Sequence, residues 1–252
     1  MKSPIRSPLE SKSLRIIKEL VPVETTLSSF LLYSGDIELS LARAGRTVVA
    51  HTNKQAIYEF WAALKKDKEK VAAAVEDFYP QIDSILFHYL QESWAQFGDA
   101  YIRAAFFFIL NRCSEYGEVS TGKIDKSYFN PIALNYLKNF EGTNFYPLWD
   151  KEENALAALS TAKQTDFTLL PIGKFSFNLF EYGKSRGYET TSVNHRELCE
   201  RVHQADRKMI VIYKKHPQLF RMYRDYNIHM IDKRGRPTNK EDKCEEIIIV
   251  NF

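Results

Sequence analysis

The sequence predicts an α/β fold with an open, largely parallel sheet. Short apolar or β-branched runs recur along the chain, and amphipathic helical patterns separate them. The first βαβ unit is the clearest. A strand pattern at 25–33 breaks at Ser34 and Gly35, a helix capped by Asp36 follows, and a second strand is expected at 47–50. Because such crossovers are right-handed, the two strands should be parallel.

The other elements follow from the same patterns. A short amphipathic helix at 12–20 ends before Pro22, and the centre of the chain is predicted to be helical. The central apolar run ends at 111–113, and a polar loop or small insertion is expected at 115–130. The remaining expected helices are 55–66, 68–78, one from Pro80 to Phe97, 154–162, one capped by Asn194, and 216–226. The remaining expected strands are 166–172, 208–213, 227–231 and 245–251. The last two strands are candidates for antiparallel pairing.

Composition narrows the function classes. The chain has 252 residues, of which 44% are hydrophobic and 27% charged, with only 10 Gly and 9 Pro, so a disordered or collagen-like chain is excluded. A net charge of +3 does not by itself argue for a polyanionic partner. Three widely separated cysteines predict reduced thiols and no metal site. Because no apolar stretch is long enough to span a bilayer, we expect a soluble, cytoplasmic or otherwise intracellular protein without a membrane partner.

Five short blocks together resemble a known family. They are 8–12 (PLESK), 31–35 (LLYSG), 50–53 (AHTN), 107–112 (FFILNR) and 166–170 (DFTLL). Their order over nearly the whole chain resembles the Dam-like class of DNA adenine-N6 methyltransferases. In that family the corresponding blocks are Pro-x-Gly-Gly-Lys, Phe-x-Gly-x-Gly, Asn-Asp-x-Asn, an apolar run ending in Leu-Asn-Arg, and the strand before the catalytic Asp-Pro-Pro-Tyr.

The resemblance implies a Rossmann-like S-adenosylmethionine-dependent methyltransferase fold. Residues 1–60 and 145–252 would form the α/β core, and 61–144 a helical insertion resembling a target-recognition segment. The resemblance places the cofactor at Lys12, Tyr33, Gly35 and His51.

The sequence departs from the family where the chemistry should be. Pro171, Ile172, Gly173 and Lys174 stand in place of Asp-Pro-Pro-Tyr, which removes both the acid that would accept from the adenine amino group and the aromatic ring that would stack on the flipped base. Tyr33 replaces a glycine, His51 replaces the acid for the ribose hydroxyls, and 10–11 replaces the early glycine pair. We therefore expect no catalytic residue, no metal and no bound S-adenosylmethionine.

These departures favour a non-catalytic DNA-binding, regulatory or structural subunit, with duplex DNA, an active methyltransferase or another protein subunit as partner. Two alternatives stay open. One is an active adenine methyltransferase with divergent motifs, which would bind S-adenosylmethionine. The other is a structural or assembly protein, as in a viral or phage particle, with no affinity for nucleic acid.

Basic side chains gather in three segments that could contact phosphate. A solvated loop accounts equally well for the mouth and the last loop, and a protein interface accounts equally well for the central segment. The candidates for contact are Arg112, Lys123, Lys126 and Tyr128 in the central segment; Lys184 and Arg186, with Lys163 and Lys174, at the mouth of the expected site; and Lys233, Arg234 and Arg236, with Lys240 and Lys243, in the last loop. His195, Cys199 and His203 share one predicted helix, where we interpret them as incidental, and Asp166 is interpreted as a strand-start carboxylate.

Overall fold

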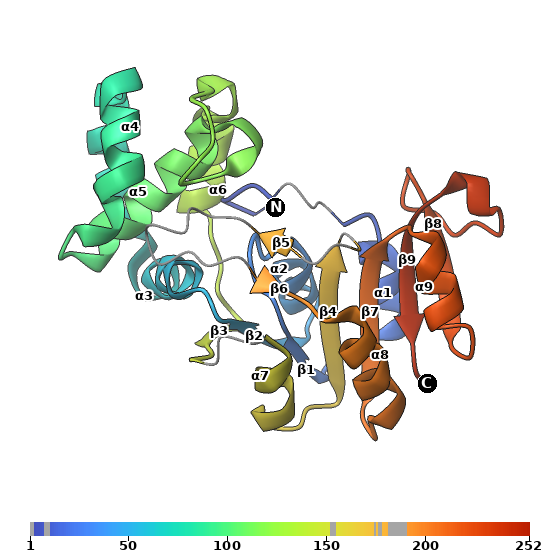
Figure 1. Cartoon of the computed structure of the whole chain (residues 1–252). Coiled ribbons are helices and arrows are strands. Elements are labelled where there is room, and N and C mark those ends of the chain that lie inside the picture. The colour runs from blue at the N-terminus through green and yellow to red at the C-terminus, as the bar shows by residue number, and fades with distance from the viewer. Residues whose placement is uncertain (1–2, 8–10, 152–154, 174, 176–177, 181–190) are drawn as a thin grey trace.

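The structure is a computed structural model that describes residues 3–7, 11–151, 155–173, 175, 178–180 and 191–252. Its centre is a seven-stranded sheet with the order β3-β2-β1-β4-β7-β9-β8, drawn in Figure 1. The strands are β1 (Thr26–Ser29), β2 (Thr47–Thr52), β3 (Phe145–Trp149), β4 (Phe167–Gly173), β7 (Lys208–Lys214), β8 (Asn227–Asp232) and β9 (Cys244–Val250); β5 (Asn178–Phe180) and β6 (Thr191–Ser192) pair separately.

The predicted α/β fold with a mostly parallel sheet is confirmed. Strands β1, β2, β3, β4 and β7 pair in parallel, and β9 is antiparallel to both β7 and β8. The chain order of the strands reverses between β1 and β4. In open α/β sheets, ligands bind beyond the carboxyl ends of the strands at such a switch point.

Helices cover both faces of the sheet because the central strands are apolar on both sides. On β7, Ile210 and Ile212 belong to the core under α1 (Leu14–Leu20), α2 (Asp36–Arg43) and α3 (Gln55–Phe78). Met209, Val211 and Tyr213 belong to the core under α7 (Ala155–Thr161), α8 (His195–Gln204) and α9 (Pro217–Met222). This alternation has the period of two that a strand requires.

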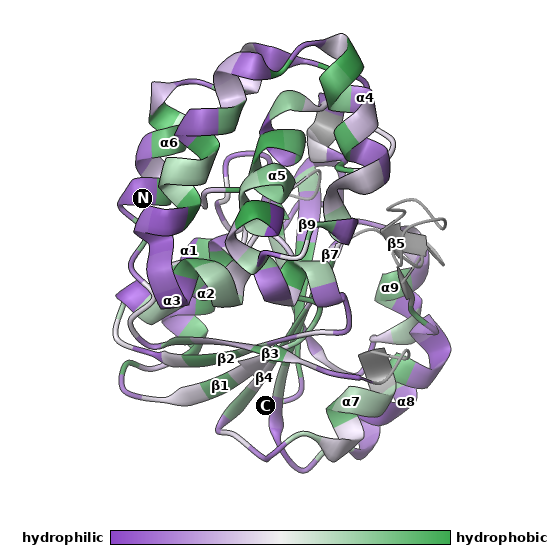
Figure 2. Ribbon diagram, turned by 90° about the vertical axis from the view of Figure 1, so that its left-hand side faces the viewer, coloured by the Kyte–Doolittle hydropathy of each residue, from purple (hydrophilic) through white to green (hydrophobic). Residues whose placement is uncertain are grey.

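A helical segment continues from α3 and stands above the sheet in Figure 2. It comprises α4 (Ser84–Ser93), α5 (Ala100–Cys113) and α6 (Pro131–Lys138). Every residue of α5 from Ala104 to Cys113 is buried, which explains why its sequence is apolar without a clear period. No described helix combines the length and the apolar character that a membrane span needs.

The helices predicted for this segment are confirmed in part. The two helices expected at 55–66 and 68–78 are confirmed, because helical geometry within α3 is interrupted at Asp67, whose φ is −159° and ψ is 85°. α3 runs through residue 60, and the expected division of the chain between 60 and 61 stays a prediction. The single helix expected from Pro80 to Phe97 is wrong, since a 3-10 turn and then α4 occupy this stretch. The new helix begins here because the Asp83 carboxylate accepts a hydrogen bond from the backbone N–H of Leu86.

Candidate functional site

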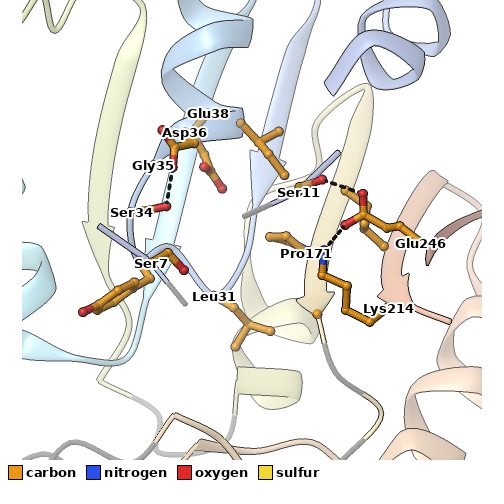
Figure 3. Close-up of a pocket in the computed structure, with 14 residues that line it drawn as sticks. Ser7, Ser11, Leu31, Ser34, Gly35, Asp36, Glu38, Pro171, Lys214 and Glu246 are labelled. Carbon is orange, nitrogen blue, oxygen red and sulfur yellow. Dashed lines mark hydrogen bonds and ion pairs between the residues drawn. The ribbon is translucent and has the colours of Figure 1, made fainter. Parts of the chain in front are cut away.

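The carboxyl ends of β1, β4 and β7 meet at a small cavity of about 50 Å³. Figure 3 shows its walls, which include Leu31 and Gly35 after β1, Pro171 near the end of β4, and Lys214 and Glu246 on β7 and β9. A cavity of this size has room for a few water molecules. Pockets for cofactors and drug-sized ligands are usually ~300–1,000 Å³.

The backbone and the packing at Gly35 both require a glycine. Its φ is +69°, in the left-handed region, and a Cβ at this position would lie 3.0 Å from Cζ2 of Trp61. Trp61, on α3, is fully buried and its Nε1 donates a hydrogen bond of 2.9 Å to the carbonyl oxygen of Tyr33. The indole therefore packs against the glycine and holds the loop after β1.

Tyr33 points into the protein and is only 6% exposed. Its hydroxyl donates to the carbonyl oxygen of Gly117 at 3.2 Å and accepts from Nδ2 of Asn111 at 3.3 Å. Asn111 lies on α5 and also donates to the Gly117 carbonyl, at 2.9 Å. The Tyr33 side chain therefore joins the loop after β1 to the helical segment.

His51, at the end of β2, is 3% exposed. Its ring stacks on Phe30 with centroids 4.4 Å apart and an angle of 15° between the planes. Its Nδ1 is 3.0 Å from a carboxylate oxygen of Asp150, the residue after β3. The imidazole is thus held between an aromatic ring and a carboxylate, and Asp150 is a site residue that sequence reasoning missed.

Glu246 organises the other side of the cavity and was also missed. It is 1% exposed, and its Oε2 accepts hydrogen bonds from Ser11 Oγ at 3.1 Å, the Lys12 backbone N–H at 2.7 Å and Ser13 Oγ at 2.5 Å. Its Oε1 lies 3.4 Å from Nζ of Lys214. A glutamate inside the apolar run CEEIIIV was the available sequence signal, because buried carboxylates need partners.

Two more carboxylates border the cavity, and both serve the local structure. Asp36 accepts hydrogen bonds of 3.0 Å from the Ser3 backbone N–H and from Ser34 Oγ. It is not the N-cap that the sequence predicted, because Gly35 occupies that position. Glu38 accepts a hydrogen bond of 2.7 Å from Ser29 Oγ, and burial raises the pKa of its carboxyl.

The basic residues of the last loop lie at this same edge of the sheet. Lys233, Arg234 and Arg236 are exposed in the connection between β8 and β9. The Asp232 carboxylate accepts hydrogen bonds from the backbone N–H groups of Arg236 and Arg234, which lowers its pKa and shapes the turn. A Cβ on Gly235 would lie 2.8 Å from the Lys12 carbonyl oxygen, so the loop packs directly against residue 12.

The structure does not group the other nucleic-acid candidates with this loop. Lys123, Lys126 and Tyr128 are exposed in the helical segment, where Lys126 Nζ donates to the Ile82 carbonyl. Lys174, Lys184 and Arg186 lie outside the described residues. Lys163 was expected at the mouth of the site, but it precedes β4 and therefore lies at the opposite, amino-terminal edge of the sheet.

The Arg112 side chain is bound by backbone carbonyl groups of the N-terminal segment. It is 9% exposed, and its Nε and Nη2 donate to the carbonyl oxygens of Pro4 at 2.6 Å and Ser3 at 3.0 Å. Burial, with a smaller effect of the nearby Arg6 charge, lowers its pKa to about 10. These contacts account for the residue without a phosphate.

The remaining candidates each have a separate partner. His195 Nδ1 pairs with the Tyr213 hydroxyl, Cys199 Sγ contacts the Met222 carbonyl, and His203 Nδ1 pairs with the Tyr226 hydroxyl. Asp166 accepts from the backbone N–H of Thr26 at the start of β1, in agreement with its interpretation as a strand-start carboxylate. No cluster of three or more potential metal ligands occurs among the described residues.

Comparison with known proteins adds no relative. No protein-family model matches this chain, and no curated protein is significantly similar to it in sequence.

Proposed function

We propose that this chain is a non-catalytic member of the S-adenosylmethionine-dependent methyltransferase fold, related to the Dam-like adenine methyltransferases, and that it acts by binding duplex DNA. The sheet supports this assignment. It is mostly parallel, and its strand order reverses beside β1. One antiparallel strand, β9, is inserted between β7 and the edge strand β8. The resemblance of the chain implies such a sheet, with the cofactor positions at its carboxyl edge.

The observation that carries the proposal is that this chain's own side chains fill those cofactor positions. Tyr33 and His51 are both buried and hydrogen-bonded, and Trp61 packs against the one retained glycine. The cavity that remains at the switch point is about 50 Å³. These residues do not fit S-adenosylmethionine, which needs a pocket of several hundred Å³.

The described residues at the end of β4 offer no group for the methyl-transfer chemistry. Pro171 and Gly173 line the cavity there, and neither side chain can accept a hydrogen bond from a base amino group. The nearest described carboxylates, on Asp36, Glu38 and Glu246, hold backbone and serine groups in place. Within the described residues, an adenine amino group therefore has no side-chain acceptor at the end of β4.

Binding of DNA is supported by the placement of the last loop. Lys233, Arg234 and Arg236 are exposed, belong to one turn, and lie beside residue 12 at the edge of the sheet where the resemblance places the nucleic acid. Exposed arginine and lysine side chains bind phosphates without reading sequence, and each contact makes binding more sensitive to salt.

The triple variant Lys233→Ala, Arg234→Ala, Arg236→Ala tests this role. We expect weaker binding to duplex DNA, and a plot of log affinity against log salt whose slope falls by about 3, one for each lost phosphate contact. Fluorescence anisotropy with a labelled duplex between about 50 and 200 mM salt measures both quantities.

A matched control removes the same charge from the opposite edge of the sheet. Lys163, Lys208 and Arg224 are exposed, and their replacement by alanine should leave the slope unchanged. If the salt slope falls by the same amount in both triple variants, the last loop has no specific role in DNA binding. If the wild-type chain shows no salt-dependent binding at all, the structural or assembly alternative replaces the proposal.

A further inference from the structure

A second, larger cavity lies between the N-terminal segment and the first turn of α6. It measures about 440 Å³ and is bordered by Ser7 and Asp36, which also border the small cavity, and by residues of the helical segment. We call it the Arg6–Tyr128 groove, after two of the residues that line it. Its volume falls within the range of ligand pockets, unlike that of the small cavity.

One wall of the groove is held rigidly. The Arg6 backbone N–H donates to Oδ1 of Asn111 at 2.6 Å, and Nδ2 of Asn111 donates back to the Arg6 carbonyl at 3.1 Å. Arg112 binds the carbonyls of Pro4 and Ser3. Residues 3–6 are therefore fixed on the end of α5, and a ligand would meet a preorganised surface.

A planar cation lies on an aromatic ring at the groove. The Arg6 guanidinium carbon is 3.4 Å from the centroid of the Tyr128 ring, and Nη1 of Arg6 is fixed by the Ser114 carbonyl at 3.1 Å. The Tyr128 side chain is nevertheless 45% exposed. Unstacked bases bind to tyrosine rings and to guanidinium planes, so this pair is a platform for a base.

The polar groups around the platform suit a base more than a bare phosphate. Positive charge comes from Arg6 and Arg112, and negative charge from Asp36 in the lining and from Asp125 near Arg6. Asn130 and Tyr136 add neutral donors and acceptors to the lining. A mixture of signs matches the donor and acceptor edge of a nucleobase, whereas a phosphate site would be dominated by cations.

We propose that the Arg6–Tyr128 groove binds one unstacked nucleotide, with its base on the Arg6–Tyr128 pair. The inference rests on the proposed function in so far as an unpaired nucleotide of DNA supplies the ligand. A free mononucleotide offers the same chemistry, and the two sources are separated by experiment.

Binding is measured by anisotropy with a labelled single-stranded oligonucleotide and by calorimetry with deoxyadenosine monophosphate. Tyr128→Ala is expected to weaken binding of the single strand about tenfold, as the loss of one base stack would. Tyr128→Phe keeps the ring and should bind within about twofold of wild type, because stacking needs no hydroxyl. The control Tyr89→Ala removes a tyrosine that is 58% exposed on α4, and it should have no effect.

The outcomes separate this proposal from the preceding one. If Tyr128→Ala binds both ligands as tightly as wild type, the groove is not a nucleotide site. This holds even if the triple variant of the last loop still loses duplex binding. Equal losses in Tyr128→Phe and Tyr128→Ala would also overturn it, because stacking would then not be the cause. A third outcome is that the chain binds no DNA but binds the mononucleotide in a way that depends on Tyr128. That outcome would support the groove with a free nucleotide as its ligand and would reject the DNA-binding function.

Discussion

Trp61→Ala is expected to lower the free energy of unfolding by about 3–5 kcal/mol, the usual cost of deleting a buried tryptophan side chain. Trp61 is fully buried, with its ring against Phe60, Phe140 and Phe145. Its loss also leaves the Tyr33 carbonyl without the indole donor. Urea denaturation followed by circular dichroism measures the change.

Two further variants give this experiment its controls. Trp61→Phe keeps most of the packing but not the hydrogen bond, so we expect a loss of about 1–2 kcal/mol. Trp149, at the end of the edge strand β3, is 37% exposed, and its replacement by alanine should cost no more than about 1 kcal/mol. If Trp61→Ala proves as mild as Trp149→Ala, the indole is not what closes the space beside Gly35.

Glu246→Ala is expected to cost about 3 kcal/mol of stability. The carboxylate is buried and binds two serine hydroxyls, one backbone N–H and the Lys214 ammonium group, so its removal leaves several polar groups without their charged partner. The adjacent residue provides the control, because Glu245 is exposed on the same strand. Glu245→Ala should change stability by less than about 0.5 kcal/mol.

The loss of stability in Glu246→Ala should begin in the segments that Glu246 contacts. Glu246 joins β9 to residues 11–13, and the loop after β8 packs on Lys12. Amide hydrogen exchange is therefore expected to rise first in residues 11–20 and in the loop 232–243. Uniformly increased exchange throughout the sheet would show instead that Glu246 acts on the whole core.

The sheet could be predicted from the sequence where strands are apolar on both sides. The runs that became β4, β7 and β9 are nearly continuous in hydrophobic residues, and each lies between two helical layers. β3 has the sequence FYPLW, and Tyr146, Leu148 and Trp149 in it are substantially exposed. Among the described strands it pairs only with β2, so neither its composition nor its pattern distinguishes it from a loop.

The site could be predicted only in part, because its contacts join distant parts of the chain. Tyr33 and His51 could be singled out from the sequence, but their partners Gly117 and Asp150 could not. The burial of Arg112 against Pro4 depends on a contact across 108 residues, which no local pattern reveals. By contrast, α6 was missed although Asn130 before Pro131 is a standard start signal for a helix.

Isothermal titration calorimetry of the wild-type chain with S-adenosylmethionine tests most directly whether its own side chains occupy the cofactor positions. Because Tyr33 and His51 are buried and hydrogen-bonded and the remaining cavity is about 50 Å³, we expect no saturable heat of binding even at millimolar ligand. A dissociation constant in the micromolar range, accompanied by incorporation of methyl groups into duplex DNA, would contradict this account and identify an active enzyme with divergent motifs.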